Sequence, residues 1–233
     1  MRLVLFDVDG TLVTARGSGR RAMTRAFAAV FGVTGPIERY DFRGKTDPQI
    51  VADLMKAAGL EPVEIAARLD AFYARYLDEL RAEIGRGAHV ALMPGIGDLI
   101  PRLSRQPGIV VGLLTGNIEG GARIKLAPTG LWSYFRVGAY GSDDADRSRL
   151  PAVAVRRAEA LIERPIETGR VLVVGDTPLD IDCARASGAV AVAVATGQHS
   201  LDELAACRPD LLFSDFADVP RTLATLLDGG SRS

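Results

Sequence analysis

The chain has 233 residues, of which 48% are hydrophobic and 24% charged, a composition typical of a globular core with or without an insertion. The formal net charge of -1, from 28 basic and 29 acidic residues, excludes a global field that would attract nucleic acid or an anionic membrane. Cys183 and Cys207 lack metal-ligand spacing and fit a reducing compartment, and no apolar stretch reaches the ~18 residues of a membrane span. We therefore expect a cytoplasmic protein.

The first predicted element is a strand in the apolar run VLFDVDGTLV, residues 4–13. Successive Val, Leu and Phe are typical of a strand buried on both faces, and the Gly-Thr that follows marks its end. Asp7 and Asp9 are two residues apart, so their side chains point the same way if the strand stays extended. At ~4 Å and an effective dielectric of ~20, two such carboxylates repel by about 4 kcal/mol. A divalent cation or a bound proton is expected to offset this repulsion.

Only helical patterns follow, over residues 18–32, 47–59 and 62–84. In the second of them Asp47 is predicted to cap the helix, with Pro48 at its first position and Gly59 as its stop. Glycine-rich stretches at residues 14–19 and 84–95 flank this region and suit hinges. We predict an all-helical cap domain, residues 15–90, inserted into a core domain formed by residues 1–14 and 91–233.

Further apolar runs predict parallel strands at residues 108–115, 136–141, 170–176 and 189–196. Helical patterns separate most of them, which predicts βαβ units and an α/β fold with a Rossmann-like parallel sheet. The second strand ends in Thr115, Gly116 and Asn117, and the fourth ends at Asp176 with Asp180 just beyond. Ligands of open parallel sheets bind at the carboxyl ends of the strands. We therefore expect these residues to meet the two aspartates of the first strand in one site.

Three segments, in chain order DVDGT, LLTGN and GDTPLDI, resemble motifs one, two and four of the haloacid dehalogenase-like hydrolases. Within that family, the chain resembles the phosphoglycolate phosphatases. The resemblance spans nearly the whole chain and includes a helical cap between motifs one and two. It implies a sheet ordered 3-2-1-4-5 around a central first strand. It also implies a Mg²⁺-dependent phosphatase that acts on a small-molecule phosphate ester through an aspartyl-phosphate. We expect neither nucleic acid nor a membrane as a partner, and a monomer or a weak homodimer.

The resemblance implies a role for each matching residue. Asp7 would be the nucleophile, and Asp9 would protonate the leaving alcohol and then activate water. Mg²⁺ would be held by the Asp7 carboxylate, the Asp9 backbone carbonyl and Asp176, with Asp180 supporting through water. The phosphate oxygens would be bound by groups after the second strand, namely the Thr115 hydroxyl and the backbone amide of Gly116 or Asn117.

The third motif of this family is a cation, usually Lys, about thirty residues after the second motif. Arg147 is the best match, with Arg149 close behind it, and Lys125 in the preceding helix is the rival candidate. We expect Arg147 to fill the role, because an arginine holds phosphate through a bidentate fork. Lys125 is expected to be a solvated charge on the helix surface.

The segment FRGKTDPQI, residues 42–50, is the part of the cap expected to face the site. A Gly-Lys-Thr loop that opens a helix combines a bendable backbone, a cation and free amides. Lys45 and Thr46 are predicted to bind the substrate, and a plain helix cap by Asp47 is the alternative. Two alternatives to a phosphatase stay open: a β-phosphoglucomutase-like phosphotransferase on the same core, and a non-catalytic binding module on the same fold.

Overall fold

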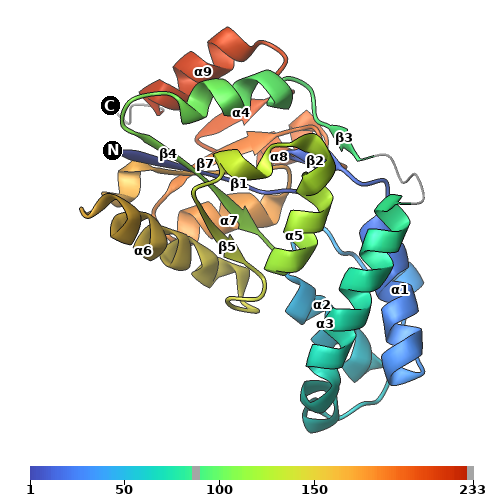
Figure 1. Ribbon diagram of the computed structural model, residues 1–233. Coiled ribbons are helices and arrows are strands. Elements are labelled where there is room, and N and C mark those ends of the chain that lie inside the picture. Colours follow the sequence, from blue (N-terminus) through green and yellow to red (C-terminus); the bar gives the residue numbers. More distant parts are fainter. Residues whose placement is uncertain (86–89, 230–233) are drawn as a thin grey trace.

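The centre of the protein is a six-stranded sheet in the order β5-β4-β1-β6-β7-β8, seen in a computed structural model that describes residues 1–85 and 90–229 (Figure 1). Every neighbouring pair in this sheet is parallel. The predicted order 3-2-1-4-5 is confirmed, and β8 adds an unpredicted strand at one edge. The strands are β1 Arg2–Phe6, β4 Ile109–Thr115, β5 Val137–Tyr140, β6 Val171–Gly175, β7 Val190–Val194 and β8 Leu211–Phe213.

Helices cover both faces of the sheet, as the continuous apolar strands require. On β1, Val4 and Phe6 pack into one buried cluster, while Leu3 and Leu5 pack into another on the opposite face. The first cluster is closed by α4 Ile96–Ser104, α5 Glu119–Leu126 and α9 Val219–Asp228. The second is closed by α6 Leu150–Ile162, α7 Pro178–Ala186 and α8 Leu201–Ala206. Short 3₁₀ helices lie at Ile37–Arg39, Ala127–Thr129, Trp132–Tyr134, Arg147–Arg149 and Thr168–Arg170.

Three of the α-helices between β1 and β4 form a separate group beside the sheet, and we call them the cap helices (Figure 1). They are α1 Ser18–Phe31, α2 Asp47–Ala57 and α3 Pro62–Gly85, close to the predicted ranges. They share a buried cluster of their own, in which the ring centroids of Phe27 and Phe72 lie 4.5 Å apart. Ile118 and Ile124 at α5 join this cluster to the core. The exact domain boundaries stay a prediction, and no described helix could span a membrane.

The two linkers of the cap helices pair with each other. β2 Val13–Thr14 and β3 Ala91–Leu92 form an antiparallel two-stranded sheet, with Val13 opposite Leu92. The Met93 amide extends the pairing by donating to the Leu12 carbonyl at 2.9 Å. The sequence predicted only glycine-rich hinges here, and residues 86–89 of the second linker lie outside the described residues. The entry to the cap helices is therefore joined directly to their exit.

Two glycines with the same backbone conformation offer a test of how the core is assembled. Gly95 has φ +79°, and a β-carbon on it would lie 1.8 Å from the Phe216 carbonyl oxygen, whereas Gly59 has φ +88° and open space around it. Gly59→Ala should cost about 1 kcal/mol of unfolding free energy, the strain of a left-handed residue. Gly95→Ala should cost at least about 2 kcal/mol more, because backbone must move. Urea unfolding measures both, and equal losses would contradict the close packing of α4 on the segment before α9.

Candidate active site

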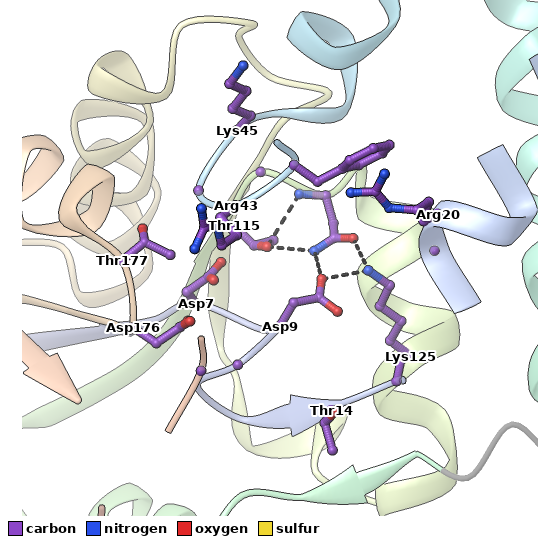
Figure 2. A pocket seen from close by; sticks show the side chains of 18 of the residues that line it. Asp7, Asp9, Thr14, Arg20, Arg43, Lys45, Thr115, Lys125, Asp176 and Thr177 are labelled. Carbon is purple, nitrogen blue, oxygen red and sulfur yellow. Dashed lines mark hydrogen bonds and ion pairs between the residues drawn. The ribbon is translucent and has the colours of Figure 1, made fainter. Parts of the chain in front are cut away.

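Polar residues from three strand ends line one cavity of about 370 Å³. Asp7 follows β1, Thr115 ends β4 and Asp176 follows β6, so the three neighbouring strands deliver them to the same edge. Figure 2 shows Asp7, Asp9 and Asp176 facing this space, and Arg20 and Lys45 line it from the cap side. The cavity therefore lies between the carboxyl edge of the sheet and the cap helices.

Buried carboxylates crowd the floor of this cavity. One oxygen from each of Asp7, Asp176 and Asp180 lies within 4.8 Å of the others. Burial raises the pKa of Asp7 to about 6 although Arg147 opposes the shift, and Asp180 and Asp9 add to it. Burial, reinforced by Asp180 and Asp7, holds the pKa of Asp176 well above its usual value. Such shifts mean that the ionised cluster lacks positive charge, which a bound cation would supply.

Arg147 is fixed between two of these carboxylates. Its Nη2 donates a short hydrogen bond to Asp180 Oδ1 and lies 3.3 Å from Asp7 Oδ1. The other Asp180 oxygen accepts from the backbone amide and hydroxyl of Thr177, the N-cap of α7, at 3.0 and 2.7 Å. Arg149 lies elsewhere, because its side chain is 70% exposed and pairs with acids of its own loop. Of the two arginines in this loop, Arg147 therefore faces the site.

Lys125 contacts the second aspartate of the first motif. Its Nζ lies 2.5 Å from Asp9 Oδ2 and donates to Asn117 Oδ1 at 2.7 Å, and the Asn117 amide also donates to Asp9 Oδ2 at 2.8 Å (Figure 2). The prediction of a solvated surface charge is wrong, because only 6% of the Lys125 side chain is exposed. The missed signal is its spacing: Lys125 lies three residues after Ala122, on the same buried face of α5.

The second motif presents a hydroxyl with a free proton. Thr115 is fully buried, and its Oγ1 accepts from the Asn117 backbone amide at 3.3 Å and the Asn117 side chain at 2.9 Å. Because both bonds use the lone pairs of the hydroxyl, its O–H remains available to a ligand in the cavity. Thr115, Gly116 and Asn117 all line the cavity, as the sequence predicted that they would.

Comparison with known proteins agrees with this arrangement. A family model described as haloacid dehalogenase-like hydrolase matches residues 4–185. The chain is a haloacid dehalogenase-like hydrolase. The match runs from the first motif through α7, so it includes the cap helices and the three strand ends that meet at the cavity. The resemblance found in the sequence and the assignment to a hydrolase are confirmed.

Relatives with curated names cover nearly the full length of this hydrolase. The phosphoglycolate phosphatase of Synechococcus elongatus is 29% identical over 229 residues, covering 97% of this chain and 99% of the relative. The phosphoglycolate phosphatase of Rhodospirillum rubrum is 30% identical over 240 residues, covering 99% of this chain and 94% of the relative. The crystal structure of a hydrolase from Pseudomonas syringae has a TM-score of 0.73 at 20% identity, covering 97% and 99% of the two chains, and shows the same fold.

The start of α2 docks the cap helices of this hydrolase onto the core. The predicted cap by Asp47 is wrong, because Thr46 is the N-cap and its Oγ1 accepts from the Gln49 amide at 3.2 Å. Thr46 Oγ1 also donates to the Ala145 carbonyl at 2.7 Å, on the loop after β5. Thr46 is fully buried and is absent from the described cavity wall, so its hydroxyl serves this joint and not the predicted substrate contact.

Asp47 completes the joint on the other strand-end loop. Its amide donates to the Gly116 carbonyl at 2.7 Å, and its Oδ2 accepts from the Ile118 amide at 2.8 Å. Burial raises the pKa of this carboxyl to about 7, while Lys125 and the Ile118 amide oppose the shift. Asp47 is therefore a buried acid at the cavity wall whose charge changes near neutral pH.

The cap cations nearest the cavity have partners within the cap. Arg20 donates to the carbonyls of Ile37 and Tyr40 at 2.6 and 2.9 Å. Arg43 pairs with Asp41, and the Lys45 ammonium lies 3.7 Å from Asp53 and 4.0 Å from the centre of the Tyr40 ring. Lys45 lines the cavity, but Figure 2 shows its side chain pointing away from Asp7 and Asp9. Substrate binding by Lys45 stays a prediction. The sequence reading missed Tyr76, which lines the cavity from the apolar stripe of α3.

Asp47 allows a prediction about pH. Folding raises the pKa of Asp47 from 3.8 to about 7, so the folded protein binds this proton more tightly than the unfolded chain does. The contribution of the protonated carboxyl to the free energy of unfolding is therefore present at acidic pH and is lost as the pH rises toward 7. Asp47→Asn keeps an oxygen acceptor for Ile118 and does not titrate. Between pH 4 and pH 8 the variant should gain on the order of 3 kcal/mol of unfolding free energy relative to the wild type.

Urea unfolding at several pH values measures this difference. Asp182→Asn, which removes an exposed acid of α7 that lies 3.4 Å from Arg185, is the matched control and should show little change with pH. A constant difference between Asp47→Asn and the wild type would contradict the buried, titrating carboxyl.

Proposed function

We propose that the chain is a Mg²⁺-dependent phosphatase that hydrolyses a small phosphate monoester through an aspartyl-phosphate on Asp7. The observation that carries the proposal is the position of Asp7, buried between the Asp176 carboxylate and the Arg147 guanidinium at the floor of the cavity. Phosphoryl transfer needs positioning and charge neutralisation, and this floor offers groups for both. The names of the two phosphoglycolate phosphatase relatives support the same substrate class.

The residues around Asp176 fit a small divalent cation. A β-carbon on Gly10 or on Gly197 would lie 2.4 or 1.8 Å from Asp176 Oδ2, so a side chain at either position would collide with this oxygen. Thr11 donates to Oδ1 at 3.0 Å, and no described residue donates to Oδ2. Oxygen ligands are what Mg²⁺ prefers. We propose that Asp7, Asp176 and the Asp9 carbonyl hold the ion, which would neutralise charge between Asp7 and the phosphate.

In this proposal Asp180 does not bind Mg²⁺ directly. Both of its oxygens already accept hydrogen bonds, one from Arg147 and the other from Thr177. It supports the metal site through its charge and orients Arg147 toward the phosphate. Arg147, the Thr115 hydroxyl and the amide of Gly116 or Asn117 would bind the phosphoryl oxygens, so Arg147 fills the third-motif role in this proposal.

Asp9 is suited to carry the proton. In the first step Asp7 forms a bond to phosphorus while the bond to the ester oxygen breaks, and that oxygen takes a proton from Asp9. In the second step Asp9 removes a proton from water, which attacks the phosphorus and releases Asp7 and inorganic phosphate. Lys125 and Asn117 hold Asp9 Oδ2, and no described residue donates to Oδ1. This leaves Oδ1 free to exchange the proton.

The cap helices would close the cavity over the substrate and exclude water. In this proposal Lys45 contacts the leaving group from the rim, in competition with Asp53. No observation here favours a mutase or a non-catalytic module. Cytoplasmic location and a monomeric or weakly dimeric state stay predictions.

Metal binding should depend on pH in a defined direction. A ligand carboxylate must lose its proton to bind, and the pKa of Asp7 is raised to about 6, so Mg²⁺ affinity should fall as pH drops through that value. Titration calorimetry at pH 8 and pH 5.5 measures the affinity directly. Asp176→Asn should abolish binding and Asp182→Asn should not. Undiminished release of inorganic phosphate after complete chelation would contradict the metal assignment.

The two buried cations should respond differently to the leaving group. 4-Nitrophenolate departs without a proton, whereas an alkyl alcohol needs one. Lys125→Met, which disturbs Asp9, should therefore lower kcat/KM for an alkyl phosphate at least about 10-fold more than for 4-nitrophenyl phosphate. Arg147→Met should lower both by a similar factor, about 100-fold or more, because it contacts the phosphoryl group.

Asp7→Asn is the reference for a dead enzyme, since an amide cannot attack phosphorus. A substrate-independent loss in Lys125→Met would show that Lys125 does not act through the proton on Asp9.

A further inference from the structure

Tyr76 of α3 brings an unpartnered hydroxyl into the cavity. The residue is 1% exposed, and its ring stacks on that of Phe72 with 6.3 Å between centroids. The hydroxyl makes no hydrogen bond with any described residue, although Tyr76 lines the cavity. The hydroxyl oxygen is not among the buried polar atoms without a partner, because it faces the cavity, where water can accept its proton in the free protein. A substrate atom that replaces this water can take over the hydrogen bond.

Two glycines leave room around this hydroxyl. A β-carbon on Gly19 would lie 3.8 Å from Tyr76 Oη and 3.4 Å from Lys125 Nζ, and one on Gly121 would lie 3.6 Å from Tyr76 Oη. An atom at the vacant Gly19 position is therefore close to both polar groups at once. That position adjoins Asp9, because the Lys125 ammonium is 2.5 Å from Asp9 Oδ2.

Both polar groups are hydrogen-bond donors at this point. An ammonium has three protons, and Lys125 directs two of them to Asp9 and Asn117, so one remains. Burial holds the pKa of Tyr76 well above its usual value, and the charges of Asp47 and Asp9 add to the shift, so the hydroxyl keeps its proton. The Lys125 ammonium and the Tyr76 hydroxyl can therefore both donate to one acceptor atom, and an oxygen can accept both hydrogen bonds.

We infer that Tyr76 is a specificity-determining residue that, with Lys125, binds an oxygen on the carbon next to the ester carbon of the substrate. The inference rests on the proposed function, in which Asp9 protonates the ester oxygen. The acceptor oxygen is three bonds beyond that ester oxygen, so it falls beside Asp9, where Gly19 leaves its position free. The substrate class is then a 2-oxygenated alkyl phosphate, with either a hydroxyl or a carboxylate as the acceptor.

The test compares three esters of similar size in Mg²⁺: 2-hydroxyethyl phosphate, 2-phosphoglycolate and propyl phosphate, which lacks the oxygen. Tyr76→Phe keeps the ring against Phe72 and removes only the hydroxyl. Its kcat/KM should fall roughly 10-fold for at least one oxygenated ester, the loss of one hydrogen bond, and much less for propyl phosphate. The ester that loses more identifies the acceptor as a hydroxyl or a carboxylate.

Two further variants keep the test specific. Tyr73→Phe removes a hydroxyl that, unlike that of Tyr76, is buried without a partner, three residues earlier on α3 and outside the described cavity wall. This variant should leave all three rates unchanged. Gly19→Ala fills the vacant position in a helix that tolerates alanine and should reduce the same preference. Equal losses for all three esters in Tyr76→Phe, or none, would overturn the inference alone. A wild type that hydrolyses none of them would overturn the inference alone if it still hydrolyses 4-nitrophenyl phosphate, and the proposed function as well if it does not.

Discussion

The site depends on one electrostatic constraint, the need to keep three buried carboxylates within 4.8 Å of one another at the edge of a sheet. Parallel strands force this crowding, because β1 and β6 are neighbours and each is followed directly by an aspartate. The capping box of α7 uses Thr177 to orient Asp180, and Asp180 in turn holds Arg147 against Asp7. The cap of α7 thus fixes, through Asp180, the guanidinium that lies beside Asp7.

The two aspartates of the first motif have separate cations. Arg147 lies at Asp7 and comes from the loop after β5, whereas Lys125 lies at Asp9 and comes from α5. Their environments also differ, since the Asp7 side chain is 8% exposed and that of Asp9 is 44% exposed. The two acids therefore differ in both their partners and their solvation, which suits the separate roles proposed for them.

The sequence predicted the features that follow from hydrophobic periodicity and from the order of the strands. It missed the contacts between side chains that are distant in the chain. The apolar runs and the three strand-end clusters identified the sheet and the floor of the cavity. Lys125 was missed although it shares a buried face of α5 with Ala122, because its partner Asp9 is far from it along the chain. Asp47 was mistaken for a cap because its acceptor role lies with Ile118, far along the chain. The edge strand Leu211–Phe213 is short and half-buried, so its pattern is weak.

The pairing of β2 with β3 has a consequence for how such proteins diversify. Because Val13 lies opposite Leu92, the chain leaves the core and returns to it at adjacent points. The helices between these points can be lengthened, shortened or replaced without changing the register of any strand in the main sheet. The residues at the floor of the cavity and the cap helices above it are thereby free to evolve at different rates. A lineage can keep its chemistry while exchanging the part that selects what the chemistry acts on.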